Sequence, residues 1–189
     1  MQDLEQYRIA VSNFAAKGTN YLFHNEGNEH ALIIFKNLFL NAKNHIRIAA
    51  NMLYNDEVVN TEEYINAMTS FLNKRNTRLS ILITQTPPID EVKKHRKETS
   101  FYWMLYNHPA YKEGRIKIKE GNGNHFSGKD GQQVNFCTCD TRMYRIETDI
   151  IKRKAIANFG DKESSADLEQ KFDVVYNSLY DVKLEDFFN

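Results

Sequence analysis

Two kinds of hydrophobic spacing alternate along residues 29–84, and this alternation constrains the fold more than any other feature of the sequence. Residues 29–42 carry apolar side chains at intervals of three and four, the spacing of a helix that buries a wide stripe. Residues 45–50 and 78–84 are short strand-like segments, and the apolar run in the second suits a central strand buried on both faces. A second helical pattern separates these strands, with Asn60 or Thr61 as its N-cap. A third helix is expected over residues 91–106, closed by Pro109. Helices that alternate with strands predict parallel pairing, because a crossover connects strands that run in the same direction.

The second half of the chain changes from alternation to consecutive strand-like segments. Polar and apolar residues alternate there as in half-exposed strands, and short turns between the segments indicate hairpins. The strand-like segments cover residues 116–119, 134–139, 144–147 and 154–159. A helical pattern follows at residues 164–179, with Ser164 or Ser165 as its N-cap. We therefore predict an α/β fold in which one mixed β-sheet is flanked by helices.

Chain length bounds the domain organisation. At 189 residues the chain has the size of one ordinary domain. Residues 1–18 show a loose helical spacing that ends at Gly18, so we expect an accessory N-terminal helix. We find no repeat, low-complexity tract or long linker in the sequence, and we expect a single domain over residues 1–189.

Charge and hydropathy narrow the classes of partner. The 25 basic residues balance the 25 acidic ones, so the whole molecule lacks the positive field typical of nucleic-acid-binding proteins. A local basic run at residues 93–97, near Tyr102 and Trp103, could still follow a phosphate backbone, although such runs are usually a solvated helix face. The sequence has no apolar stretch of the roughly 18–20 residues that a membrane helix needs, and residues 1–8 open with charge rather than with a signal peptide. We expect a cytoplasmic protein with no membrane partner.

The two cysteines, Cys137 and Cys139, are spaced so that both thiols face one side of a strand. A disulfide between such close neighbours would be strained and would close almost no loop, which favours a reducing compartment. A tetrahedral zinc site needs four ligands, and the sequence has no second cysteine pair. We expect two small buried residues here, with no metal and no cofactor.

Three local segments, in the predicted order of elements, resemble the phospholipase-D-like superfamily. The first is the helix and strand at residues 31–50. The second is residues 135–140 followed by 144–147, and the third is residues 155–161 with the apolar positions of the helix after it. The resemblance spans roughly residues 20–180 and implies a phospholipase-D-like fold.

Members of this superfamily carry an H-x-K-x4-D motif. The resemblance implies a histidine that forms a phosphohistidine, a lysine that holds the phosphate and an aspartate that tunes the histidine. Registering Asp140 on the motif's aspartate puts Gln133 at the histidine position and Asn135 at the lysine position. Glutamine is not a nucleophile at phosphorus, and asparagine supplies no positive charge. The resemblance therefore implies a catalytically degenerate domain, with no catalytic residue at these positions.

Strand alternation indicates which residues could still bind a ligand. On a strand over residues 144–147, Arg145 and Glu147 share one face, close in sequence to Asp140. The plainer interpretation is a structural ion pair on the sheet. The functional one is that Asn135, Asp140, Arg145 and Glu147 line the remains of the superfamily's phosphate pocket and bind an anion without turning it over. We expect Asp140, Arg145 and Glu147 on one face, near the carboxyl end of the sheet.

The glycine-rich loop at residues 121–131 offers a rival site. It places His125 four residues before Lys129, a pair that could serve an active nuclease or phosphodiesterase. Glycines there would let the backbone approach an anion, but the loop lacks the residue order of a P-loop. The rival site requires His125 to reach Lys129 and Asp140 in the folded protein. We keep both residues as candidate binding residues.

These patterns leave three functional hypotheses in order of preference. The first is a binding or interaction module for an anion, a nucleotide, a nucleic acid or a protein partner. The second is the nuclease or phosphodiesterase that uses His125 and Lys129. The third is a structural subunit whose exposed aromatic tail, Phe187-Phe188, pairs with another chain. Superfamily members with one motif per chain commonly pair two copies, so the resemblance also implies a two-fold symmetric homodimer with the Asp140 strand near the interface.

Overall fold

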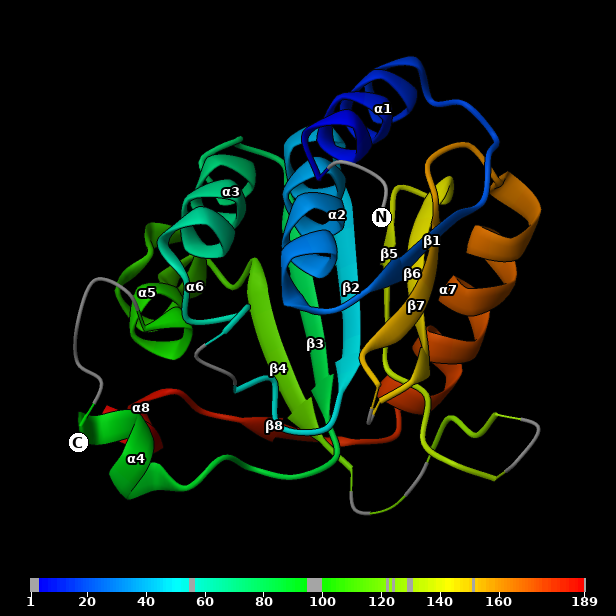
Figure 1. Ribbon diagram of the computed structural model, residues 1–189. Helices are drawn as coiled ribbons and strands as arrows, with labels where there is room; N and C mark the ends of the chain where they lie inside the picture. The colour runs from blue at the N-terminus through cyan, green and yellow to red at the C-terminus, as the bar shows by residue number, and fades with distance from the viewer. Residues whose placement is uncertain are drawn as a thin grey trace.

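One mixed β-sheet forms the centre of the molecule (Figure 1). The computed structural model describes residues 4–54, 57–94, 100–121, 123, 125–128, 131–150 and 152–188. The strands are β1 (Phe23–Glu26), β2 (His45–Ala50), β3 (Arg78–Ile83), β4 (Ile116–Glu120), β5 (Phe136–Cys139), β6 (Met143–Asp149), β7 (Lys154–Asn158) and β8 (Tyr180–Val182). The helices are α1 (Leu4–Lys17), α2 (Asn28–Asn41), α3 (Glu62–Leu72), α4 (Ile89–Lys94), α5 (Phe101–Asn107), α6 (Pro109–Lys112), α7 (Lys162–Tyr176) and α8 (Glu185–Phe188).

The order of strands in the sheet is β1-β7-β6-β5-β2-β3-β4-β8. Strands β2, β3 and β4 pair in parallel, as the helix and strand alternation predicts. Strand β5 pairs antiparallel with β2, and the hairpins β5-β6 and β6-β7 extend the sheet to β1. The predicted α/β fold with a mixed sheet is confirmed.

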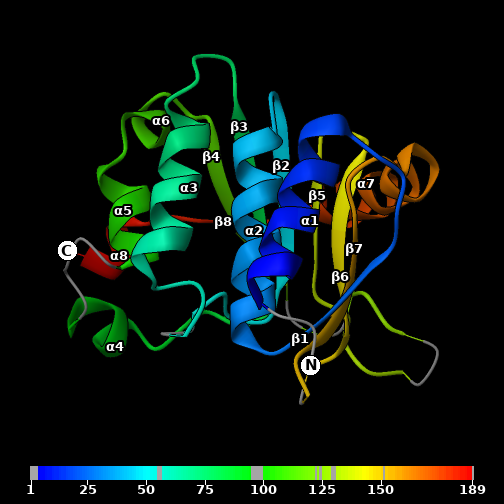
Figure 2. The same ribbon diagram turned by 45° about the horizontal axis from the view of Figure 1, so that its top comes forward.

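Helices cover both faces of the sheet. Helices α1, α2 and α3 lie on one face and α7 lies on the other (Figures 1 and 2). The apolar stripe of α2 supplies Ile34, Leu38 and Phe39, which are fully buried in the core with Ile46 and Ile48 of β2. Each fully buried side chain of this size contributes about 1.5–3 kcal/mol to stability. Residues that alternate with these on β2, such as Arg47, face α7 instead.

The N-cap residue is one of the predicted candidates for α3 but not for α7. Of the two candidates Asn60 and Thr61, Thr61 is the N-cap of α3, and its hydroxyl accepts a hydrogen bond from the Tyr64 amide at 3.3 Å. The prediction of Ser164 or Ser165 as the cap of α7 is wrong, because the Asp161 side chain caps it and accepts from the Ser164 amide at 3.0 Å. Aspartate and serine cap equally well, so local preference alone does not choose between them.

The segment between β3 and β4 differs from the single helix expected over residues 91–106. It contains α4 and α5, and residues 95–99 between them lie outside the described ranges. Most of the basic run at 93–97 therefore lies outside them as well. Pro109, expected to close a helix, instead begins α6, where its missing amide hydrogen has no consequence.

The aromatic tail packs back onto the protein. Phe187 and Phe188 are buried, with ring contacts to Tyr102 and Trp103 of α5. The hypothesis of a structural subunit that pairs through an exposed Phe187-Phe188 tail is thus wrong in its premise. Within the described ranges, no helix combines the length and hydrophobicity required to cross a membrane.

Candidate functional site

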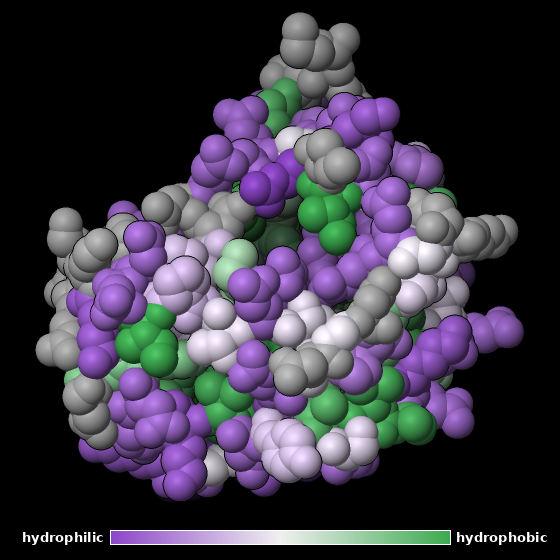
Figure 3. Space-filling view, turned by 90° about the horizontal axis from the view of Figure 1, so that it is seen from below, coloured by the Kyte–Doolittle hydropathy of each residue, from purple (hydrophilic) through white to green (hydrophobic). Residues whose placement is uncertain are grey.

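A cavity of about 250 Å³ opens beside the end of β2, at the carboxyl edge of the parallel strands. Its lining comes from the start of α2, the segment after β2, the start of β5, and β6 with the turn that follows it. Figure 3 looks onto this end of the molecule and shows a hollow with hydrophobic side chains at its floor. Ligands of open α/β sheets commonly bind at the carboxyl ends of parallel strands, since the loops diverge there.

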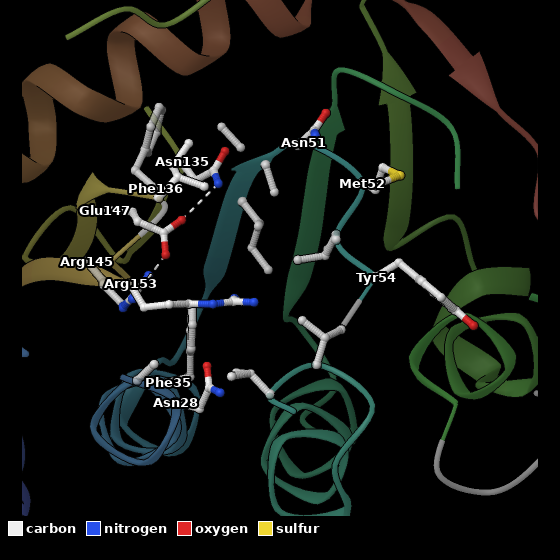
Figure 4. Close-up of a pocket in the computed structure, with 18 residues that line it drawn as sticks. Asn28, Phe35, Asn51, Met52, Tyr54, Asn135, Phe136, Arg145, Glu147 and Arg153 are labelled. Carbon is white, nitrogen blue, oxygen red and sulfur yellow. Dashed lines mark hydrogen bonds and ion pairs between the residues drawn. The ribbon is translucent and has the colours of Figure 1, made fainter. Parts of the chain in front are cut away.

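The cavity has an apolar side and a polar side. Phe35, Ile48, Ala50, Val58 and Val59 give it hydrophobic walls. The polar side chains Asn135, Glu147 and Arg145 lie together on the strands opposite the segment after β2 (Figure 4). An apolar pocket with a few convergent polar groups is the usual form of a small-ligand site.

The neutral side chains of Thr84, Gln133 and Asn135 form a chain of hydrogen bonds that ends at Glu147, on the polar side of the cavity. The Thr84 hydroxyl, just past β3, lies 3.4 Å from the Gln133 side-chain oxygen. The amide of Gln133 donates to the side-chain oxygen of Asn135 at 3.2 Å. The amide of Asn135 in turn donates to Glu147 Oε2 at 2.9 Å. These contacts fix the orientation of the Glu147 carboxylate, because its neighbours are themselves held in place.

Arg145 and Glu147 lie side by side on β6 and are both buried. The distance from Arg145 Nη2 to Glu147 Oε1 is 3.7 Å, which is an ion pair but too long for a strong hydrogen bond. The Arg145 guanidinium also lies over the Phe35 ring, 4.8 Å from its centroid, a cation–π contact. Burial lowers the pKa of Arg145, and the nearby Glu147 charge partly offsets this. The guanidinium stays protonated at neutral pH, since arginine is a very strong base.

Two buried polar atoms at the site lack a protein partner. Within the part of the chain that the structure describes, neither Nε of Arg145 nor Oδ1 of Asn28 has a hydrogen-bond partner. Such atoms are rare in folded proteins, because an unpaired buried donor or acceptor loses about 1–3 kcal/mol of hydration without replacement. Both residues line the cavity. Arg145 Nε and Asn28 Oδ1 are thus a donor and an acceptor that the protein's own groups do not use at this wall of the cavity.

The rim of the cavity is charged and partly exposed. Arg153 is the last residue of the β6-β7 turn, and its side chain is 42% exposed. Its guanidinium lies 3.8 Å from Glu57, whose carboxylate also accepts a hydrogen bond from the Asn28 amide at 2.6 Å. The Gly27 amide donates to the Arg153 carbonyl at 3.2 Å, which places the start of α2 beside the rim.

Comparison with solved structures identifies the fold. Nuc from Salmonella typhimurium, a phospholipase D family member, superposes with a TM-score of 0.57 and 12% identity, covering 87% of this chain and 99% of Nuc. NucT from Helicobacter pylori gives a TM-score of 0.55 and 12% identity, over 86% of this chain and 100% of NucT. TrmBL2, an archaeal chromatin protein that binds DNA, gives a TM-score of 0.60 and 12% identity, over 94% of this chain. The chain has a phospholipase-D-like fold.

Sequence comparison adds nothing to this likeness. No protein family model matches the chain, and no curated protein matches it by sequence. The chain spans 62% of the length of TrmBL2, so the phospholipase-D-like fold accounts for part of that protein.

Gln133 and Asn135 are the residues that the sequence analysis registers on the motif's histidine and lysine. They precede β5 and belong to the hydrogen-bonded chain that ends at Glu147. Asn135 also lines the cavity itself. The structure thus brings Asn135, Arg145 and Glu147 together within the phospholipase-D-like fold, as the sequence analysis expects.

Asp140 requires a correction, because it does not join this group. It follows β5, which runs antiparallel to β2, so it lies at the amino edge of the sheet, away from the cavity. Its carboxylate accepts hydrogen bonds from the backbone amides of Lys43, Asn44 and His45, the last two at 2.8 and 2.9 Å. Asp140 therefore holds the start of β2 in place.

The rival site around His125 is only partly described. The ring of His125 packs so closely on the backbone of Gly121 that a side chain there would collide with it. Gly121 follows β4 at the carboxyl edge, whereas Asp140 lies at the amino edge, so His125 does not meet Asp140. Lys129 lies outside the described residues. The contact between His125 and Asp140 that the rival site requires is therefore not formed.

Cys137 and Cys139 are free thiols in the core, with their sulfur atoms 3.9 Å apart. Both side chains point to the same face of β5, as predicted, and burial raises the pKa of Cys139 well above its usual range. Across the described part of the chain, no cluster of three or more His, Cys, Asp or Glu side chains is arranged to hold a metal ion.

Sequence reasoning missed Asn28, Phe35 and Arg153, which belong to the cavity. Phe35 belongs to the apolar stripe of α2, so the sequence predicts that it packs beside the sheet. The sequence does not predict its contact with Arg145. Asn28 and Arg153 meet only because the β6-β7 turn lies against the start of α2. The spacing of polar and apolar residues in a short segment does not predict this contact, because it depends on how distant strands pair.

Proposed function

We propose that this chain is a phospholipase-D-like domain that binds nucleic acid and does not hydrolyse it. The observation that carries the proposal is the hydrogen-bonded chain from Gln133 through Asn135 to Glu147, set beside an open cavity. Hydrolysis by the superfamily's route needs a nucleophile and a cation at the first two positions. Here both positions hold neutral amides whose hydrogen bonds are already made.

The choice of nucleic acid as ligand draws support from the proteins of the same fold. TrmBL2 is a chromatin protein that binds DNA, and Nuc is a phospholipase D family member. The neutral charge of the whole chain argues against strong, unspecific attraction to a polyanion. We therefore expect modest affinity that depends on contacts at the cavity rather than on a broad basic surface.

A paired measurement tests the proposal. Fluorescence anisotropy with labelled single-stranded and duplex oligonucleotides should show saturable binding at micromolar protein in low salt. The same oligonucleotides and bis-p-nitrophenyl phosphate should remain intact over hours with the same protein. The absence of binding to every oligonucleotide would sink the proposal.

The nuclease alternative makes the opposite prediction for one variant. Its supporting observation is that Nε2 of His125 is buried without a hydrogen-bond partner among the described residues. If hydrolysis occurs and His125→Ala abolishes it, the alternative replaces the proposal. Hydrolysis that His125→Ala leaves unchanged would indicate a contaminating nuclease. The matched control is His24→Ala, at an exposed position of β1.

We also propose that two copies pair, as the fold resemblance implies. Loss of the motif's histidine and lysine leaves an apolar subunit contact intact, and exposing such a contact would cost about 25 cal/mol per Å². Light scattering at micromolar concentration should give a mass near twice the 22.1 kDa of one chain. A clean monomer mass would remove this proposal. The free thiols of Cys137 and Cys139 support a reducing compartment, and we propose the cytoplasm.

A further inference from the structure

We infer that the cavity binds one unpaired nucleotide, with its base in the interior and its phosphate at the rim. This inference rests on the proposed nucleic-acid binding and assigns it to a site and a chemical class. It implies that the domain prefers single strands, bulges or displaced bases over regular duplex. Four features of the cavity support it: its charge balance, its unpartnered atoms, its walls and its rim.

The interior of the cavity is balanced in charge. Arg145 is accompanied by Glu147 at 3.7 Å, so the buried cation already has a carboxylate beside it. A bare phosphate placed there would lie against the Glu147 carboxylate as well as the guanidinium, and like charges repel strongly in a buried site. A neutral ligand avoids this repulsion. The balance therefore favours a neutral group over the simple anion expected from the sequence.

The unpartnered atoms specify what that neutral group must offer. Arg145 Nε is a free donor and Asn28 Oδ1 a free acceptor within the described part of the chain. Glu147 Oε1, which receives the long contact from Arg145, adds a second acceptor. The ligand should therefore carry hydrogen-bond donors and acceptors close together on one edge. The edge of a nucleobase has this pattern, and side-chain amides, carboxylates and guanidinium groups are the usual readers of it.

The size and walls of the cavity fit a flat aromatic heterocycle. A volume of about 250 Å³ is enough for a base but not for a stacked pair of bases. The walls from Ile48, Ala50, Val58 and Val59 are aliphatic and would cover the faces of the ring. Proteins that extract a base from its stack hold it in this way, with apolar contacts on its faces and hydrogen bonds at its edge.

The rim supplies what a phosphate requires. The Arg153 guanidinium is 42% exposed, and its 3.8 Å contact with Glu57 is a loose surface pair that an incoming phosphate can replace. Helix α2 begins beside it and runs for 14 residues from Asn28, so its amino-terminal dipole favours an anion there. The base would thus occupy the apolar interior and the phosphate the cationic rim. A nucleotide can use both regions, whereas a free phosphate or a simple sugar cannot.

Calorimetry with the four ribonucleosides and their 5′-monophosphates tests the inference on the full chain. We expect at least one nucleoside to bind, with its monophosphate binding about fivefold or more tightly. An oligonucleotide should bind about tenfold to a hundredfold more tightly than a base-free sugar–phosphate strand of equal length, because only the normal strand makes hydrogen bonds at the edge of a base and apolar contacts on its faces.

Three substitutions locate the site. Ala50→Leu fills the cavity and should reduce nucleoside affinity at least tenfold. Arg153→Gln should weaken the monophosphate about fivefold and leave the nucleoside within twofold of wild type. Lys152→Gln is the matched control, because Lys152 is the exposed neighbour of Arg153 and does not line the cavity. If Ala50→Leu fails to fold, Asn28→Ala at the partly exposed helix start removes the unpartnered acceptor instead.

The outcomes separate this inference from the proposed function. Equal affinity for normal and base-free strands, with no nucleoside binding, overturns the inference and leaves nucleic-acid binding standing. No binding to any oligonucleotide removes the proposed function. Mononucleotide binding that Ala50→Leu does not reduce also overturns the inference, because it places the ligand elsewhere on the protein.

Discussion

Two arginines pack against opposite faces of the same sheet, Arg47 partly buried and Arg145 buried, and they are partnered very differently. Arg47 on β2 faces α7, and its Nε and Nη2 donate to the two Asp173 oxygens at 2.9 and 3.0 Å. Its Nη1 lies 3.2 Å from Glu169. Arg145 on β6 faces α2, has one ion pair at 3.7 Å, and leaves Nε unpartnered within the described residues.

The difference separates a structural cation from one available to a ligand. The bidentate pair of Arg47 and the bonds from Thr141 to Glu169 at 2.7 and 2.8 Å tie α7 to two places on the sheet. Each of the three guanidinium nitrogens of Arg47 thus faces a carboxylate of α7. Arg145 uses its burial and its contact with Phe35 to hold position, and keeps hydrogen-bonding capacity at a cavity wall.

The largest effect should come from Arg47→Ala. This change leaves Glu169, which is buried, and Asp173, whose side chain is 44% exposed, without their cation. Breaking a fully buried ion pair on one side costs about 3–5 kcal/mol, and the exposure of Asp173 lowers the expected loss to about 2–4 kcal/mol. Urea denaturation should show this loss, while nucleotide affinity measured well below the melting temperature stays at the wild-type value. A fall in affinity with little loss of stability would reverse the roles assigned to the two arginines.

Asp140→Ala should come next. The change removes the acceptor of three backbone amides at residues 43–45, and water can replace part of it because this edge is partly exposed. We expect a loss of about 1–2 kcal/mol in the free energy of unfolding, with no change in nucleotide affinity. Reduced affinity at unchanged stability would return Asp140 to the binding site.

The stability of the protein should depend on pH through His45, which lies on the same strand as Arg47. Burial, and then the charges of Arg47 and Arg78, lower the pKa of His45 to about 4. The unfolded chain binds the proton more readily, with a pKa of about 6.5, so stability is full above that pH and declines as pH falls toward 4. Between pH 7 and pH 5 the wild type should lose about 1 kcal/mol more than His45→Gln, after allowance for partial exposure. Parallel pH profiles for the two proteins in urea denaturation would contradict the prediction.

The smallest effect on stability should come from the double variant Arg145→Met, Glu147→Gln. Replacing both members of a buried pair is often neutral, and the amide oxygen that Glu147→Gln introduces can still accept from Asn135, so we expect a change below about 1 kcal/mol. Nucleotide binding should be lost. A stability loss as large as that of Arg47→Ala would show that the Arg145 pair is structural, which is the plainer interpretation of the sequence.

Much of the fold can be predicted from the spacing of apolar residues within short segments of the sequence. The bounds of β2 agree with the prediction, because apolar period and flanking polar residues define a strand locally. The helix expected over residues 91–106 was wrong because α4 and α5 each carry a helical pattern, and a single window does not show that they are separate helices. The cap of α7 was wrong because several good capping residues precede it.

The candidate site also contains both residues whose positions the sequence predicts and residues whose positions it does not. The shared face of Arg145 and Glu147 could be predicted because a strand has a period of two, whatever the sheet around it. Asp140 was misplaced because nearness in sequence was taken for nearness in space, although the antiparallel run of β5 carries Asn135 and Asp140 to opposite edges. Arg153 and Asn28 depend on contacts between segments more than 100 residues apart, which the sequence does not reveal by pattern.

The contacts of Asp140 also have a consequence for how the sheet is assembled. Its carboxylate accepts from the amides of residues 43–45, so one side chain joins the end of β5 to the α2–β2 connection, about 95 residues away in the chain. Strand β5 is the antiparallel neighbour of the parallel strands. Asp140 therefore fastens the antiparallel part of the sheet to the parallel part at the amino edge, and the carboxyl edge can vary in sequence without disturbing that junction.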